Sequence, residues 1–168
     1  MSQTLYAPWR LDYIKSVSDG PNECFLCTTA KTPDDDAAHM VLARGTHCLL
    51  MLNRYPYVNG HLLVAPYRHA PTPTELSPEE RAEVMELLTL GQQALGRSMN
   101  PQGYNIGFNI GKCAGAGVPG HIHAHIVPRW NGDINFLTVF GDVRVIPQAI
   151  EQAYAELAQA VAALIPAK

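Results

Sequence analysis

The stretch that decides the expected fold is His121-Ile122-His123-Ala124-His125, in which histidine alternates with apolar residues. On a β-strand, successive side chains point to opposite faces of the sheet. The three imidazoles are therefore expected on one face, about 6.6–7 Å apart, with Ile122 and Ala124 directed into a core. This stretch predicts a half-buried strand over residues 121–127 that carries reactive groups on its other face.

A one-sided row of imidazoles suits either metal binding or the holding and attack of a phosphate. Neutral imidazole is a good nucleophile near neutral pH, and imidazolium donates two hydrogen bonds. The glycine-rich loop 111–120 directly precedes the row, and its backbone N–H groups could turn toward an anion, although each glycine could equally serve a hairpin loop. We favour phosphate chemistry; a histidine-only metal site and a merely solvated strand face are the alternatives.

The same loop contains Gly115-Ala116-Gly117-Val118-Pro119-Gly120, which fits the spacing of a dinucleotide-binding fingerprint. That fingerprint requires a following helix, whereas a strand is expected here, and Pro119 would interrupt the helix start. We therefore expect no organic cofactor.

Further strands are expected on both sides in the sequence. The apolar runs 47–52 and 61–66 are separated by a segment that ends in Asn59-Gly60, a strong turn signal, so they predict neighbouring antiparallel strands. Residues 104–110 predict another strand, and the polar segment 28–38 predicts a surface loop.

Two helices are predicted. The first begins with Ser77 as N-cap, Pro78 as first helical residue and Glu80 as the partner in a capping box. Its expected buried residues are Val84, Met85, Leu87, Leu88 and Leu95. The second helix has apolar residues at steps of three and four, namely Ile150, Tyr154, Leu157, Val161 and Leu164. Strands with two segregated helices predict an α+β fold with one mainly antiparallel sheet.

Length and composition restrict the class of protein. A chain of 168 residues corresponds to one domain, and 47% apolar with 16% charged residues is an ordinary globular balance. Twelve Lys and Arg against fifteen Asp and Glu give a net charge of −3, so no basic surplus favours nucleic acid as a partner. No apolar run is long enough for a membrane span, and the N-terminus lacks the apolar region of a secretory signal, so we expect a cytoplasmic protein without a membrane partner.

Two of the four cysteines, Cys24 and Cys27, have C-x-x-C spacing. In a reducing compartment this spacing indicates a metal site or redox chemistry rather than a structural disulfide. Zinc prefers four nitrogen or sulfur ligands in a tetrahedron, and a C-x-x-C turn supplies two of them. A redox pair or unliganded cysteines are the alternative.

The chain resembles the histidine-triad (HIT) superfamily, whose signature is similar to residues 121–128. The resemblance spans about residues 5–150, and its downstream and N-terminal parts look like the bacterial diadenosine tetraphosphate phosphorylase-like (ATP adenylyltransferase-like) branch. The segments that carry it are 5–10, 53–56, 60–66, 105–109, 121–130 and 132–136. It implies a single HIT domain over residues 1–168 with a roughly five-stranded sheet: an N-terminal arm (1–23), a core (24–128) and a C-terminal extension and helix (129–168).

The resemblance also implies roles for particular residues. His123 resembles the nucleophile that becomes a nucleotidyl-histidine, His125 a phosphate-contacting residue and His61 a fourth catalytic histidine. The substrate-binding positions that it implies are Asn53 for ribose, Asn109 for phosphate, and Gly117 in the glycine-rich loop together with His125. Some family members carry a hydroxyl or amide just before the triad, where this chain has Val118, Pro119 and Gly120, so the general acid is unassigned.

Zinc-bearing members of the superfamily imply the rest of the metal site. Segment 65–76 resembles the one that carries their third ligand, which would be His69, and the fourth would be His121. Cys24, Cys27, His69 and His121 would then form a closed structural zinc site.

The function that the resemblance implies is cleavage of diadenosine polyphosphates at the α-phosphorus, with diadenosine tetraphosphate and inorganic phosphate as substrates and a homodimer as the assembly. The alternatives are hydrolysis of dinucleoside polyphosphates or nucleotide phosphoramidates, a non-catalytic nucleotide-binding module, and a metal-dependent interaction domain. The presence of His123 argues against the loss of turnover.

Overall fold

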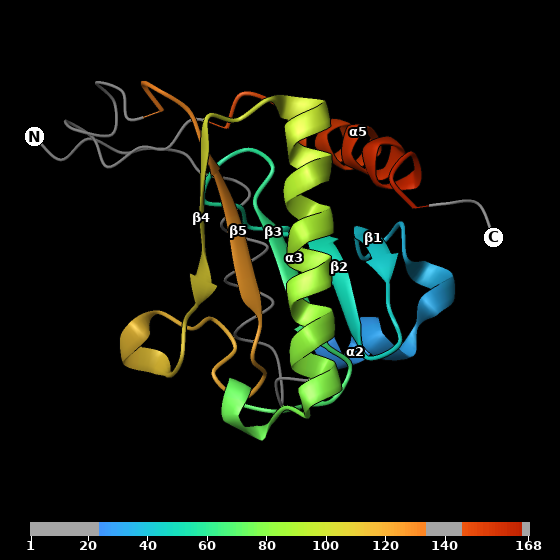
Figure 1. The fold of residues 1–168 in the computed structure, drawn as a ribbon, viewed down its shortest axis with the longest axis vertical. Helices are drawn as coiled ribbons and strands as arrows, with labels where there is room; N and C mark the ends of the chain where they lie inside the picture. Colours follow the sequence, from blue (N-terminus) through green and yellow to red (C-terminus); the bar gives the residue numbers. More distant parts are fainter. Residues whose placement is uncertain (1–23, 134–145, 166–168) are drawn as a thin grey trace, which may run out of the picture.

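The computed structural model describes residues 24–133 and 146–165, and these build one five-stranded antiparallel sheet with helices on both faces (Figure 1). The strands are β1 (Val41–Arg44), β2 (Cys48–Leu52), β3 (Leu62–Pro66), β4 (Gly103–Phe108) and β5 (Ala124–Arg129). Their order across the sheet is β1-β2-β3-β5-β4, with every neighbouring pair antiparallel. The α+β class and the antiparallel sheet expected from the sequence are confirmed.

The predicted division into arm, core and extension is only partly covered by these residues. The arm over residues 1–23 lies outside them, as does much of the extension. Within the part that the structure covers, no helix is both long and apolar enough to cross a membrane.

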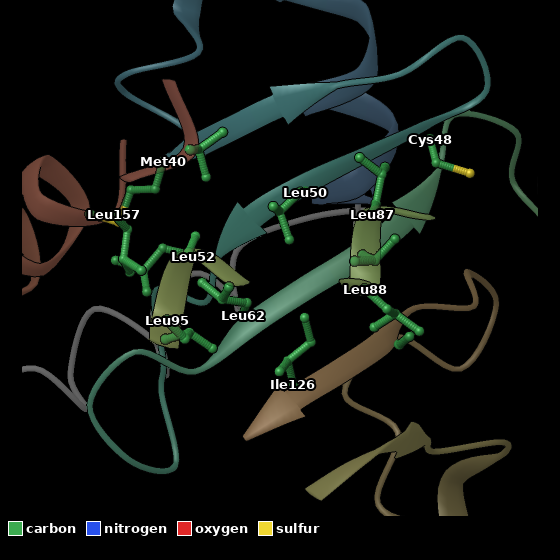
Figure 2. Close-up of a cluster of buried hydrophobic side chains, with 14 of the residues drawn as sticks. Met40, Cys48, Leu50, Leu52, Leu62, Leu87, Leu88, Leu95, Ile126 and Leu157 are labelled. Carbon is green, nitrogen blue, oxygen red and sulfur yellow. The ribbon is translucent and has the colours of Figure 1, made fainter. Parts of the chain in front are cut away.

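Helices α3 (Pro78–Met99) and α5 (Ile150–Ala162) cover one face of the sheet (Figure 1). Alternate strand residues point toward them, so this face holds the larger apolar core (Figure 2). Its members include Cys48, Leu50, Leu52, Leu62, Val64, Val84, Leu88, Leu95, Ile126 and Leu157. A Cβ at Gly91 would lie only 2.7 Å from Ile126, so glycine at this position allows α3 to approach the sheet closely.

The start of α3 follows the prediction. Ser77 accepts a hydrogen bond from the Glu80 backbone N–H, and the Glu80 carboxylate accepts one from the Ser77 backbone N–H. The predicted buried side is correct except for Met85, which is 61% exposed because it lies outside the helix stripe that faces the sheet.

The opposite face carries a smaller core formed by Leu26, Val41, Leu49, Met51, Leu63 and Ala65. Leu26 belongs to α2 (Phe25–Lys31), a seven-residue helix where the sequence predicted a loop from residue 28. Strand β1 was also not predicted. Both elements are short, and only two residues of α2 and one of β1 are buried, so neither has a clear hydrophobic period.

The loop between β2 and β3 ends at Gly60, which has a φ of +73°, and His61 follows directly before β3. The expected Asn-Gly turn is therefore present at this point. Strand β5, by contrast, begins at Ala124 rather than at residue 121, because the Ile122 backbone N–H donates to Ala70 outside the sheet ladder. His121 and His123 thus precede the strand instead of lying along it.

The Glu83 carboxylate of α3 accepts three backbone hydrogen bonds from the β1–β2 turn, from Thr46 at 2.6 Å, His47 at 2.6 Å and Cys48 at 2.7 Å. We expect Glu83→Ala to lower the free energy of unfolding by about 2 kcal/mol, because three charge-assisted bonds are lost at a partly solvated turn. Urea denaturation measures this. Glu86→Ala, at an exposed site one turn further on, is the control, and equal effects of the two changes would contradict the expectation.

Candidate functional site

Three histidines lie beside the paired part of β3 and β5, on the sheet face turned away from α3. His125 lies on β5 and is paired with Leu63 of β3, which belongs to the smaller core on that face. His61 precedes β3 and His123 precedes β5. All three are buried, at 0%, 6% and 8% exposure for His61, His123 and His125. The structure therefore brings the three predicted catalytic residues together.

His123 has a defined tautomer. Its Nδ1 lies 2.9 Å from the backbone carbonyl oxygen of His121, and a carbonyl only accepts, so Nδ1 carries the proton. The other nitrogen, Nε2, is then left with a lone pair. Burial lowers the pKa of His123, although the bond to His121 opposes this shift, so the ring stays neutral at neutral pH. A buried neutral imidazole with a free Nε2 is suited to nucleophilic attack.

His61 and His125 form an ordered pair. The Nδ1 of His61 receives the Tyr57 backbone N–H at 3.1 Å and the Asn53 side-chain amide at 3.2 Å, so it is unprotonated. The Nε2–H of His61 therefore donates to Nδ1 of His125 at 2.9 Å. His125 must then carry its own proton on Nε2. The result is a chain of donors that ends at the Nε2–H of His125.

The end of this chain lies beside the Asn109 amide and the His123 ring. The Asn109 side-chain nitrogen lies 3.4 Å from Nε2 of His125, and the rings of His123 and His125 are 4.9 Å apart between centroids. An N–H group beside a nucleophile could stabilise an anionic oxygen. The phosphate contacts predicted for Asn109 and His125 stay predictions.

The other two predicted substrate positions are placed differently. Asn53 binds His61, as described above, and its Oδ1 accepts the Tyr55 backbone N–H at 3.0 Å. Gly117 lies exposed in the loop before β5, with open space where a Cβ would be. Its φ is not in the left-handed region, unlike those of Gly111 and Gly115. Their substrate contacts stay predictions.

The His61–His125 pair is held in the neutral state. Burial, then the positive charge that His125 and His123 would carry, lowers the pKa of His61 to about 3. Burial, then His123, lowers the pKa of His125 to about 4. Protonating His125 would also place two donors against one another in the His61–His125 hydrogen bond, and protonating His61 would place its Nδ1–H against the Tyr57 backbone N–H.

The lowered pKa values of His61 and His125 predict that the protein loses stability in acid. The unfolded chain has histidine pKa values near 6.5, so it binds these protons first as the pH falls. The two histidines therefore leave the free energy of unfolding unchanged above pH 6.5 and lower it below, by about 2 kcal/mol each at pH 5. In urea denaturation between pH 7 and 5, His61→Gln is expected to remove about half of this loss. The same pH dependence in both proteins would contradict it.

A second cluster lies beside the triad. Cys24, Cys27, His69 and His121 each offer one ligand atom, and these four atoms lie within 4.8 Å of one another. Nδ1 of His121 is 3.2 Å from Sγ of Cys24 and 3.4 Å from Sγ of Cys27, whose sulfur is also 3.2 Å from Nδ1 of His69. In a tetrahedral zinc site the sulfur–nitrogen edges are about 3.5 Å long. The predicted ligand set therefore has the composition and spacing of a four-coordinate zinc site.

His121 links the two clusters. Its Nε2–H donates to the Pro66 carbonyl oxygen at 2.8 Å, which leaves the Nδ1 lone pair facing the two sulfurs. Its own carbonyl oxygen accepts the hydrogen bond from the Nδ1–H of His123. The same residue therefore contributes to the metal cluster through its side chain and orients the nucleophile through its backbone.

Sequence reasoning missed three groups at this site: Tyr57 and the carbonyl oxygens of Pro66 and His121. Backbone carbonyls have no sequence signature. Tyr57 could have been noticed as an aromatic residue just before Gly60 and His61, since its ring centroid lies 4.4 Å from that of His61.

Comparisons with known proteins identify the family of this chain. The HIT domain family matches residues 35–132, more than half of the chain. The AP-4-A phosphorylase of Mycobacterium tuberculosis is 37% identical over 153 residues, which cover 88% of this chain and 78% of that protein. This chain belongs to the HIT domain family. The fold and the triad described above are therefore those of a HIT domain.

Two further relatives help to place this HIT domain. The bis(5'-nucleosyl)-tetraphosphatase (asymmetrical) of Schizosaccharomyces pombe is 34% identical over 84 residues, half of this chain and 46% of that protein. Among solved structures, a zinc-bound histidine triad family protein from Mycobacterium smegmatis superposes with a TM-score of 0.68 and 31% identity. The match covers 86% of this chain and 97% of that one.

Proposed function

We propose that this HIT protein is a nucleotidyltransferase that cleaves diadenosine tetraphosphate by phosphorolysis through a nucleotidyl-histidine intermediate. The observation that carries the proposal is the tautomer of His123, whose Nδ1–H is held by the His121 carbonyl so that Nε2 is free to attack. The 37% identity to a protein named AP-4-A phosphorylase supports the choice of substrate.

In the first step, Nε2 of His123 attacks the α-phosphorus, and the bond from this phosphorus to the bridging oxygen breaks. ATP leaves, and AMP is bound to His123 through a phosphorus–nitrogen bond. The departing oxygen gains negative charge, and the Nε2–H of His125 is the donor best placed to stabilise it, next to the Asn109 amide. His125 is thus our candidate for the hydrogen-bond donor to the leaving oxygen; its neutral ring keeps its proton, and the general acid stays unassigned.

In the second step, an oxygen of inorganic phosphate attacks the same phosphorus and releases His123, which yields ADP. Water in place of phosphate would yield AMP, the outcome of an asymmetric hydrolase. Splitting the reaction in two lets one site use both nucleophiles in turn. Substrate contacts by Asn53 with ribose and by Gly117 with phosphate belong to the same proposal.

One incubation tests the reaction: diadenosine tetraphosphate with and without inorganic phosphate, with the products separated by chromatography. ADP and ATP formed only with phosphate would support phosphorolysis. AMP and ATP in both samples would replace it with hydrolysis. Bound nucleotide without any product would favour a non-catalytic binding module. Metal-dependent binding of another protein, again without turnover, would favour an interaction domain. Nucleotide phosphoramidates tested in parallel cover the remaining hydrolase alternative.

The metal that we propose for the Cys24, Cys27, His69 and His121 cluster is zinc. All four ligands come from the protein, so the site would be closed and structural, supplying an anchor between α2 and the triad rather than an activated water. A histidine triad relative is zinc-bound in its crystal structure. Two reduced thiols are needed for this site, which is why we place the protein in the cytosol.

We propose a homodimer that forms through β4. This strand is at the edge of the sheet and is paired only with β5. It and the residues after it expose three large apolar side chains, Ile106 at 45%, Phe108 at 39% and Ile110 at 47%. An exposed apolar edge strand is a template for pairing with another chain, and a second copy would extend the sheet.

Ile106→Lys is expected to convert the dimer into a monomer, because a lysine on an edge strand opposes strand pairing. Size-exclusion chromatography with light scattering measures the mass. Met85→Lys, a change at a more exposed apolar residue on α3, is the control and should leave the mass unchanged. A monomeric wild-type protein, or a dimer that persists in Ile106→Lys, would contradict the role of β4.

A further inference from the structure

Tyr57 lies in the β2–β3 loop and contacts the His61–His125 pair in two ways. Its backbone N–H donates to Nδ1 of His61 at 3.1 Å. Its ring lies against both imidazoles: the centroid distance is 4.4 Å to His61 and 5.8 Å to His125, and the ring is nearly parallel to that of His125, at 21°. Tyr57 is 39% exposed, whereas the two histidines are buried.

The backbone contact determines which nitrogen of His61 is protonated. With Nδ1 occupied by the Tyr57 N–H, His61 can donate only through Nε2, and His125 must accept through Nδ1. If His61 changed its tautomer or turned over, His125 would lose this constraint, and its proton could move to the nitrogen that faces away from the substrate.

The contact of the Tyr57 ring with both imidazoles also holds the His61–His125 pair in this orientation. Stacking of aromatic rings favours particular relative orientations of the rings, and the Tyr57 ring touches both members of the pair. The ring is itself partly exposed, while the two imidazoles that it packs against are buried.

We propose that Tyr57 is a positioning residue for the reaction: its ring and backbone hold His61 and His125 so that the Nε2–H of His125 is presented to the leaving oxygen. The inference rests on the proposed function and assigns a role to a residue that does not itself react. A tyrosine at this place could instead stack on a nucleotide base, and the two roles differ in their consequences.

Few other charges act on the pair. In the part of the chain that the structure describes, the charge effects on His61 come from His125 and His123, and those on His125 come from His123. Tyr57 faces the pair from the β2–β3 loop, and the neutral amides of Asn53 and Asn109 from the ends of β2 and β4. Removing the Tyr57 ring should therefore act on the His61–His125 pair mainly by exposing it to water, which raises the pKa values of both rings toward 6.5.

The test compares Tyr57→Ala with Tyr57→Phe in the full-length protein. Proton–nitrogen correlation NMR of the imidazoles, without nucleotide, reports tautomers and titration directly. We expect a single tautomer of His125 with a protonated Nε2 in the wild type and in Tyr57→Phe. Tyr57→Ala keeps the backbone N–H but removes the ring that packs against both imidazoles. Without the ring to hold the loop against the pair, we expect this hydrogen bond to loosen, with averaged tautomers for His61 and His125 and titration closer to pH 6.5.

Turnover of diadenosine tetraphosphate is the second readout. Tyr57→Ala is expected to lower kcat about tenfold with KM changed less than about twofold, and to move the acid limb of the kcat profile to higher pH. Tyr57→Phe should behave as the wild type. A rise in KM with unchanged kcat, pH profile and tautomers would overturn the proposal in favour of base stacking.

The two readouts separate this inference from the proposed reaction. If no variant turns over the substrate but the imidazole tautomer is lost in Tyr57→Ala alone, the positioning role stands and the reaction is wrong. If the wild type turns over and Tyr57→Ala keeps the same tautomers and pH profile, the reaction stands and the positioning role is wrong.

Discussion

Replacing His123 by asparagine is expected to abolish turnover of diadenosine tetraphosphate, with a fall in kcat of at least about 10⁴-fold. Asparagine has no nitrogen lone pair able to form the phosphorus–nitrogen bond, so the two-step route is closed, and direct attack by phosphate would have to replace it. The measurement is the rate of ATP release, combined with mass spectrometry of the protein quenched during turnover, which should show one adenylyl group on wild-type His123.

The fold should survive this change, because the rest of the sheet and its two cores do not depend on the imidazole. Circular dichroism and urea denaturation of His123→Asn check this. His47→Asn, at an exposed histidine, is the matched control and should keep full activity. An active His123→Asn variant, or a wild type that never carries an adduct, would refute the covalent mechanism.

The second large effect is expected from loss of the metal. Cys27→Ser should reduce bound zinc from about one per chain to almost none and lower the free energy of unfolding by several kcal/mol. Structural zinc contributes about 10–16 kcal/mol in small zinc-finger peptides that have little core of their own. The loss of unfolding free energy in Cys27→Ser should be smaller, on the order of 3–5 kcal/mol, because the sheet has two apolar cores of its own. Metal analysis and urea denaturation measure the two quantities.

Cys113→Ser provides the control, since Cys113 is exposed in the glycine-rich loop, away from the cluster. It should change neither zinc content nor stability. A purified wild-type protein of normal stability without zinc would contradict the structural role of the cluster. Since His121 orients His123 through its carbonyl, we also expect chelation to weaken turnover before it unfolds the chain.

The elements that could be predicted from the sequence are those with local signals. The capping box at Ser77 and Glu80 and the turn at Asn59-Gly60 act within a few residues, so the pattern is complete in the sequence. Strand β1 and helix α2 lack such signals, because their few buried residues depend on partners elsewhere: the Tyr154 hydroxyl, for instance, donates to the Val41 carbonyl oxygen from α5.

The candidate site also has parts that could be predicted from the sequence and parts that could not. Residue types at His61, His123 and His125, and the spacing of Cys24 and Cys27, were sufficient to predict the kind of chemistry and, with the family resemblance, its place. The strand expected over residues 121–127 was wrong at its start, because it begins at Ala124. His121 faces the cysteines, as the family resemblance implied.

What the sequence determined by itself was the set of reacting and ligating groups, together with the apolar pattern that makes one antiparallel sheet. Only the tertiary structure decided which nitrogen of each imidazole carries its proton. That choice depends on backbone acceptors such as the Pro66 and His121 carbonyls and on backbone donors such as the Tyr57 N–H, which have no side-chain signature in the sequence. It also joined Cys24 to His121 across 97 positions, because packing of α2 against the sheet, rather than any local preference, brings those two atoms together.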